Sequence, residues 1–116
     1  MLSKNQLADQ LALQQTMNST VDPEWLTANY AWHRAIMVEA VEALDHFGWK
    51  WWKKSEPDVP QVQIELVDIW HFVLSATLVG TGGRVSDAIE SLVGRFESSF
   101  SYDHADTRHL FDLLAA

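Results

Sequence analysis

The stretch EAVEALDHFGWKWWKK, residues 39–54, contains the features that decide the fold. Its first half reads as the end of an apolar helix that stops at Gly48, because glycine adopts the left-handed conformation after a helix without strain. Its second half places three tryptophans among lysines in a connection, and the two prolines that follow prevent one continuous helix. Glu39 and Glu42 interrupt the apolar run one helical turn apart, and their charges in this position call for an explanation.

Start and stop signals divide the chain into helices, and strand patterns are weak. Ser3 with Gln6 predicts a capping box, Asp22 and Pro23 read as the start of the second helix, and Asp58 is placed to cap the third. The sequence predicts a single all-α domain over residues 1–116, a helical bundle with two long central antiparallel helices. The expected helices are about Ser3–Asn18, Pro23–Phe47, Gln61–Val79, Ser86–Ser99 and Ala105–Leu114.

Composition narrows the class of protein. The 116 residues are 47% hydrophobic and 21% charged, which is typical of a globular domain. A formal net charge of −8 repels phosphate backbones, so nucleic acid is not an expected partner. The absence of cysteine excludes disulfides and thiolate zinc sites. The N-terminus has no apolar signal core, and the apolar run Ile69–Val79 is too short to span a membrane, so we expect a soluble, cytoplasmic protein.

The expected second and third helices carry more apolar surface than a small bundle can cover. The third is apolar on nearly every side, which is typical of a buried helix. The second has apolar residues on two opposite faces, with Met37, Val41 and Leu44 on one of them. We therefore expect a homodimer or higher homo-oligomer.

Two pairs of acidic residues stand within these apolar helices. Glu39 with Glu42 forms ExxE, and Glu65 with Asp68 forms ExxD, so each pair lies on one face of its helix. An antiparallel hairpin brings such pairs face to face. At roughly 5 Å and an effective dielectric constant of about 20, each pair of like charges costs about 3 kcal/mol. Solvated faces are the simpler interpretation of one pair, but the third helix offers no wet face.

A counter-charge is therefore needed, and oxygen ligands without cysteine favour Mg²⁺, with Mn²⁺ as the alternative. Such an ion, held by carboxylates, typically binds substrate phosphates and promotes attack of water on phosphorus. The residues thus favour hydrolysis of a nucleoside polyphosphate. Asp68 and His71 at i, i+3 also leave a di-iron bundle open, although such sites need more histidines than this sequence places there.

Two segments carry a resemblance to a known family. MVEAVEALDHFGWKWWKK, followed by VQIELVDIWHFVLS, is similar to the core of the dimeric all-α dUTPases. That family belongs to the all-α nucleoside triphosphate pyrophosphatase superfamily, which also holds the MazG-like enzymes. The resemblance implies a Mg²⁺-dependent homodimer that hydrolyses dUTP, and also dUDP, to dUMP.

The resemblance also implies roles for individual residues. The metal ligands would be Glu39, Glu42, Glu65 and Asp68, and Glu39 would help to activate the attacking water. Trp51 would line the nucleoside pocket and His71 would lie by the sugar or base. The segment LQQTMN resembles a first-helix motif that would place Gln15 and Asn18 against uracil, and both amides offer a donor and an acceptor to an imide edge. Taken alone, each of the four expected substrate-binding residues also fits a structural role: Gln15, Asn18, Trp51 and His71.

The resemblance covers roughly Leu11–Ser75, and after Gly80 the chain does not match the segment that closes over the phosphates in the family. Two alternatives therefore stay open beside a dUTP diphosphatase. One is a MazG-like pyrophosphohydrolase of broad specificity. The other is a shortened, non-catalytic dimeric relative.

Overall fold

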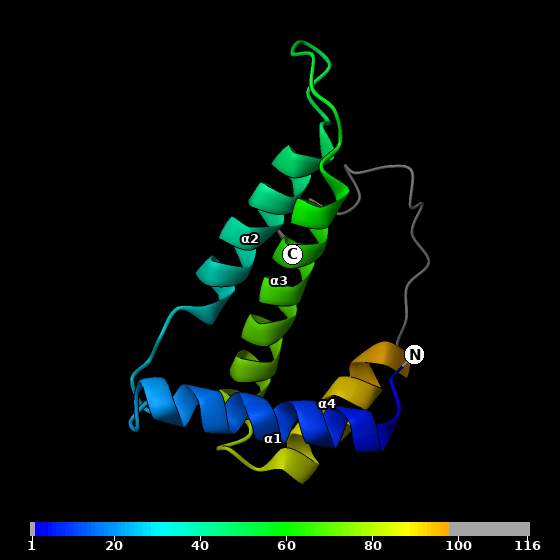
Figure 1. The fold of residues 1–116 in the computed structure, drawn as a ribbon. Helices are drawn as coiled ribbons and strands as arrows, with labels where there is room; N and C mark the ends of the chain where they lie inside the picture. Colours follow the sequence, from blue (N-terminus) through cyan, green and yellow to red (C-terminus); the bar gives the residue numbers. More distant parts are fainter. Residues whose placement is uncertain (1, 98–116) are drawn as a thin grey trace.

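The computed structural model describes residues 2–97, which form helices without any strand (Figure 1). The predicted helix Ala105–Leu114 and the predicted end of the fourth helix at Ser99 lie outside these residues. The all-α fold is as the sequence predicts. The helices are α1 (Lys4–Val21), α2 (Trp32–Phe47), α3 (Val59–Gly80) and α4 (Val85–Glu97).

Helix α1 begins at the predicted capping box. The main-chain N–H of Gln6 donates to Ser3 Oγ at 3.1 Å, and the main-chain N–H of Ser3 donates to Gln6 Oε1 at 2.9 Å. These two bonds satisfy donors that a helix start leaves without partners. The helix continues to Val21, three residues beyond the predicted end.

The predicted start of the second helix at Pro23 is wrong, because α2 begins only at Trp32. Asp22 caps a turn instead, since its carboxylate accepts from the main chain of Glu24 and from the hydroxyl of Tyr30. Such local side-chain bonds compete with a helix. The turns also bury Trp25, whose indole N–H donates to Ser19 Oγ at 3.1 Å. A helix that began at Pro23 would have moved the indole of Trp25 away from Ser19 of α1.

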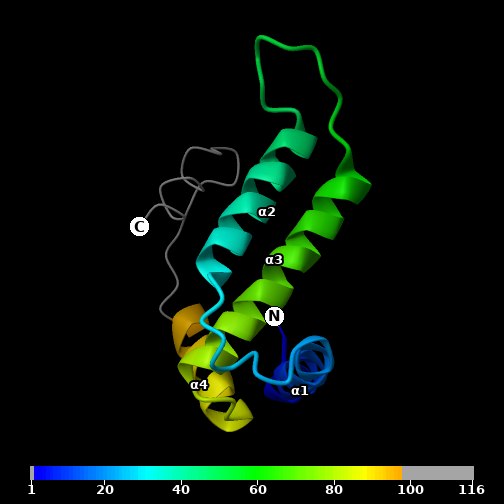
Figure 2. The same cartoon turned by 90° about the vertical axis from the view of Figure 1, so that its left-hand side faces the viewer.

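Helices α2 and α3 form the predicted antiparallel hairpin (Figures 1 and 2). The first ends at Gly48, which has a φ of 77°, and the second starts at Asp58, whose side chain accepts from the N–H of Gln61 at 3.2 Å. The main-chain N–H of Asp58 also donates to the carbonyl of His46 at 2.8 Å, which closes the base of the tryptophan-rich connection. These bonds fix the register between the two helices.

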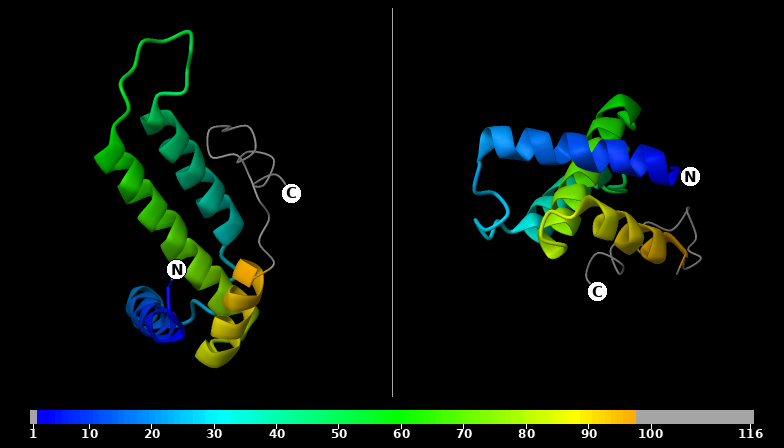
Figure 3. Two further views of the ribbon diagram at one scale, coloured as in Figure 1. Left: turned by 90° about the vertical axis from the view of Figure 1, so that its right-hand side faces the viewer. Right: turned by 90° about the horizontal axis from the view of Figure 1, so that it is seen from below.

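Helices α1 and α4 lie across the C-terminal end of α3, away from the connection (Figures 1 and 3). The hydrophobic core is at this end of the molecule. Its buried residues come from α1, the following turn, α3 and α4: Leu7, Leu11, Trp25, Leu74, Leu78, Ala88 and Leu92. The rest of the hairpin extends beyond this core.

This arrangement leaves apolar side chains of the hairpin uncovered in the single chain. On α3, the exposed fractions of Ile64, Leu66 and Val67 are 53–55%. On α2, Met37 and Val38 are about half exposed. The single chain thus leaves part of α3 uncovered, as expected for a small bundle with this much apolar surface, because α1 and α4 cover only its C-terminal half.

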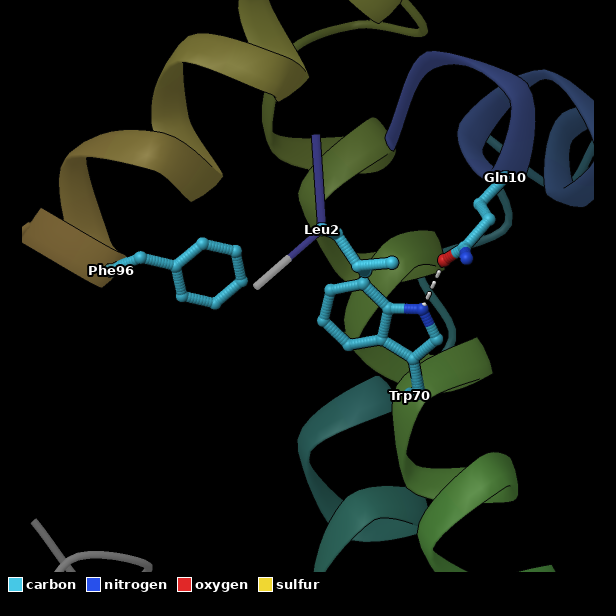
Figure 4. A pocket seen from close by; sticks show the side chains of 4 residues that line it. All are labelled: Leu2, Gln10, Trp70 and Phe96. Carbon is cyan, nitrogen blue, oxygen red and sulfur yellow. Dashed lines mark hydrogen bonds between the residues drawn. The ribbon is translucent and has the colours of Figure 1, made fainter. Parts of the chain in front are cut away.

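Trp70 of α3 joins α1 and α4 to the hairpin (Figure 4). Its indole N–H donates to Gln10 Oε1 at 2.6 Å, and its ring stacks on Phe96 with 6.3 Å between the ring centroids. A pocket of about 500 Å³ lies between these residues and Leu2. Trp70 therefore holds both flanking helices while leaving an apolar hollow beside them.

Candidate metal centre and adjoining pocket

Three carboxylates of the hairpin meet. Each of Glu39 and Glu42 on α2, and Glu65 on α3, offers one oxygen, and these oxygens lie within 4.8 Å of one another. The i, i+3 spacing puts the first two on one face of α2, and the antiparallel register places Glu65 opposite them. The two helices thus combine into one acidic cluster.

The cluster is built around a buried charge. Glu65 is only 4% exposed, and its carboxylate accepts from Gln61 Nε2 at 2.8 Å. His46 Nε2 lies 3.7 Å from the same carboxylate oxygen. A buried carboxylate needs such donors, because water cannot solvate it.

The protonation of the cluster shows how strongly these groups interact. The hydrogen bond to Glu65 raises the pKa of Glu39 to about 7, and burial and the charge of Glu42 act in the same direction. The pKa of Glu65 is lowered, chiefly because Gln61 donates to its charged form. A proton held between Glu39 and Glu65 therefore offsets part of the repulsion when no cation is bound.

Asp68, the fourth predicted ligand, is not part of this tight group. It is half-buried on α3, one turn after Glu65. Three carboxylates fit a hard divalent cation, because Mg²⁺ in proteins usually keeps several water ligands. The i, i+3 spacing puts Asp68 on the same face of α3 as Glu65.

A second pocket, of about 360 Å³, lies between α1 and α3 and has polar groups in an apolar lining. It includes His71, which follows Glu65 by six residues on α3. Its lining residues are Gln10, Leu13, Gln14, Met17, Val67, Trp70, His71 and Leu74. We call it the amide pocket.

A chain of side-chain hydrogen bonds runs beside the amide pocket. Gln14 bonds to His71 through Oε1 and Nδ1, and its Nε2 donates to Asn18 Oδ1 at 2.8 Å. Asn18 Nδ2 donates to Ser75 Oγ, also at 2.8 Å. The structure thus brings together two of the predicted substrate-binding residues, Asn18 and His71, through two residues that the sequence analysis did not select.

Of these two residues, Gln14 and Ser75, Gln14 is the one that the sequence could have indicated. It is polar and only 4% exposed. Its position in the sequence gives a signal that would have found it. Leu7, Leu11, Gln14 and Asn18 follow the 4, 3, 4 spacing of one helix face, and the two leucines are buried. Gln14 therefore continues the core-facing stripe of α1.

Gln15 has a different partner from the other predicted residues. Its Nε2 donates to the carbonyl of Gly83 at 3.1 Å, in the turn between α3 and α4. The structure gives this side chain a role in holding that turn, and it does not bring Gln15 into the hydrogen-bond chain of Asn18 and His71.

Trp51 stays on the surface in the single chain. It is 88% exposed, and its ring meets only the edge of Trp52 among its aromatic neighbours in the described residues. The connection that carries it lies at the opposite end of the hairpin from α1 (Figure 1). The structure therefore does not bring Trp51 to the amide pocket.

A helical hairpin with converging carboxylates, next to a pocket with amide groups, defines an all-α protein with a candidate cation site. The family model described as dUTPase matches residues 6–102 of the chain. The chain therefore belongs to the dimeric all-α dUTPase family, as its motifs predict, and the match extends past Gly80. No curated protein and no solved structure matches it.

Proposed function

We propose that this protein is a Mg²⁺-dependent nucleotide diphosphatase that hydrolyses dUTP, and also dUDP, to dUMP. The observation that carries the proposal is the convergence of Glu39, Glu42 and Glu65 within 4.8 Å in a chain of the dUTPase family. Membership of the family supports a dUTP-related hydrolase. The carboxylate cluster supports the metal.

The donor set suits Mg²⁺, with Mn²⁺ as a substitute, because it consists of carboxylate oxygens alone. In our proposal Glu39, Glu42 and Glu65 hold the ion, with Asp68 as the fourth ligand. Bound there, the ion supplies positive charge for the phosphate oxygens and acidifies water. The raised pKa of Glu39 supports this assignment, since a proton occupies the place where a cation would relieve the repulsion.

The chain's own groups divide the remaining tasks. Glu39 is the candidate base that removes a proton from the attacking water, because its carboxylate belongs to the cluster that would hold the ion and its water. Asn18 and His71 are the candidates for contact with uracil and the sugar, and their shared hydrogen-bond chain beside the amide pocket supports this. Gln15 and Trp51 stay candidate substrate-binding residues that would have to move, or to act across a subunit boundary.

We also propose that the protein works as a cytoplasmic homodimer. The half-exposed apolar residues of α2 and α3 support self-association. By length and hydropathy alone α3 would pass as a membrane span, as core helices of soluble proteins also do. Because α3 contributes Glu65 to the cluster and packs against α2, we interpret it as a core helix whose open face meets a second copy.

The test is an assay of pyrophosphate release from dUTP, dCTP, dTTP, dATP and dGTP, with and without Mg²⁺. We expect turnover of dUTP only when Mg²⁺ is present. We expect Glu42→Gln and Asp68→Asn each to abolish it while the circular dichroism spectrum stays helical, since each removes a ligand and a repelling charge. Equal turnover without added metal would contradict the proposal.

The same assay separates the two alternatives. A MazG-like enzyme of broad specificity would hydrolyse dCTP and dTTP at rates similar to dUTP. A non-catalytic relative would release no pyrophosphate from any nucleotide and would still form a helical dimer. The non-catalytic alternative is supported by the scarcity of cations after Gly80, where the sequence has only Arg84, Arg95 and Arg108.

A further inference from the structure

We infer that a directional hydrogen-bond chain fixes the tautomer of His71 as the Nδ1–H form, and that Ser75 is the positioning residue that sets its direction. The tautomer follows from contacts between α1 and α3 alone. Its consequence for the base rests on the proposed function.

The chain is anchored on the main chain of α3. Ser75 Oγ donates to the carbonyl oxygen of His71 at 2.9 Å, and a carbonyl can only accept. The hydroxyl has a single proton, so Ser75 Oγ has only lone pairs left for Asn18. The Asn18 atom that lies 2.8 Å from it must therefore be the amino nitrogen Nδ2.

The donor and the acceptor of each remaining hydrogen bond are then fixed. With Nδ2 on Ser75, Asn18 presents Oδ1 to Gln14, and the Gln14 atom at 2.8 Å must be Nε2. Gln14 therefore presents Oε1 to His71 Nδ1. An amide oxygen has no proton to give, so Nδ1 carries the hydrogen, and Nε2 of the neutral ring is a bare acceptor.

The bond from Ser75 Oγ to the His71 carbonyl distinguishes the two possible directions of the hydrogen-bond chain. In the reverse direction Ser75 would donate to Asn18, Asn18 to Gln14, and Gln14 to an unprotonated His71 Nδ1. Every side chain would keep its partner, and only the bond from Ser75 Oγ to the His71 carbonyl would be lost. Because Ser75 is 1% exposed and Gln14 is 4% exposed, water has little access to compensate.

The fixed tautomer gives the amide pocket a defined pattern of donors and acceptors. His71 and Gln14 both line the pocket. In this inference the remaining ring nitrogen is the acceptor that His71 can offer to a ligand. Such an acceptor pairs with the N–H of an imide base such as uracil, whereas the corresponding nitrogen of cytosine has only a lone pair. Ser75 thus influences base selection through His71 without being assigned any contact with the nucleotide.

Nuclear magnetic resonance of ¹⁵N-labelled protein tests the tautomer directly, through the correlations between the ring nitrogens and the ring protons of His71. We expect the Nδ1–H pattern in the wild type and a mixture with the Nε2–H form in Ser75→Ala. Ser75→Thr should restore the wild-type pattern, because a helical threonine hydroxyl bonds the same carbonyl. Asn18→Ala, at a less buried position, should also give the mixture by cutting the chain.

Thr77→Ala is the matched control. Thr77 Oγ1 donates to the carbonyl of Val73 at 2.8 Å. This variant therefore removes the same kind of bond from the same helix, at a residue that is not part of the hydrogen-bond chain. We expect it to leave the His71 tautomer unchanged. A wild type in the Nε2–H form, or pure Nδ1–H in both Ser75→Ala and Asn18→Ala, would overturn the inference.

Calorimetric binding of dUMP and dCMP measures the consequence. We expect Ser75→Ala to reduce the preference for dUMP about tenfold, which is the value of one well-formed hydrogen bond, and Thr77→Ala to leave it intact. An unchanged preference in Ser75→Ala would refute the role in base selection. If the wild type binds neither nucleotide, the proposed function fails, while the tautomer of His71 is still decided by the resonance measurement.

Discussion

At the scale of single residues, the chemistry of this protein follows from where like charges are forced together. Glu39 and Glu65 belong to different helices and share a proton because the antiparallel hairpin brings their carboxylate oxygens within 4.8 Å of each other. Gln61 and His46 then favour the charged form of Glu65, so the proton stays with Glu39. The protein thus carries a group that titrates near neutral pH.

This proton predicts how stability depends on pH. The folded-state pKa of Glu39 is about 7 and its ordinary value is 4.5, so this group stabilises the fold fully below pH 4.5 and loses that effect as pH rises to about 7. We expect the thermal midpoint of Glu39→Gln to depend less on pH than that of the wild type between these values in metal-free buffer. Parallel curves for the two proteins would contradict the raised pKa.

Trp51 provides a second test at this scale. If it lines the nucleoside pocket of the assembled enzyme, Trp51→Ala should raise KM for dUTP with a smaller effect on kcat, because a stacking surface for the base is lost. Trp51→Phe keeps a ring and should recover most of the affinity. Since Trp51 is 88% exposed, neither change should lower the thermal midpoint appreciably. An unchanged KM would mean that the ring does not meet the nucleotide.

At the scale of helices and turns, the ends of α2 decide how the hairpin forms. Its start is set by polar contacts of Asp22 and by burial of Trp25, which delay the helix until Trp32. Its end is set by Gly48, whose φ of 77° directs the chain into the connection. The length of α2 thus reflects tertiary packing at one end and a local glycine at the other.

Two glycine substitutions separate these backbone effects. Gly48→Ala should destabilise the fold by about 1 kcal/mol, because alanine is strained at positive φ and its Cβ would lie 3.2 Å from Ser55 Oγ. Gly94→Ala should instead stabilise by roughly 0.5–1 kcal/mol, since α4 has open space at that position and alanine favours helix. Urea unfolding of both variants measures this, and equal shifts of the same sign would argue against the left-handed cap.

At the scale of the whole molecule, one end is packed and the other is open. The core lies where α1 and α4 cross α3, while the part of the hairpin with the carboxylates and the connection extends away from it. Met37, Val38 and Val41 line a shallow apolar surface on α2 next to Glu42. A second copy that covers this surface would also remove water from the carboxylates.

This surface predicts the oligomeric state. We expect the wild type to sediment as a dimer and Met37→Lys to weaken the dimer, because the substitution puts a charge into the apolar contact. Val21→Lys is the control, since Val21 is similarly apolar and exposed at the end of α1. A wild type that stays monomeric at high concentration, or equal effects of both variants, would count against this interface.

The sequence alone determined the helical fold, the hairpin and the acidic face of each central helix, because caps, glycines and i, i+3 spacing act locally. Ser3, Gly48 and Asp58 ended or began helices where their chemistry predicts. It also predicted the family, since the motifs around Glu39 and Glu65 are contiguous.

Only the tertiary structure decided what depends on contacts between distant segments. Helix α2 starts late because Trp25 packs into the core. Asp68 lies outside the tight carboxylate group, and Gln15 donates to the Gly83 carbonyl. The tertiary structure also revealed Gln14 as the link between α1 and His71. Helical spacing gives the face on which a side chain lies, but the partner it meets there depends on how the helices cross.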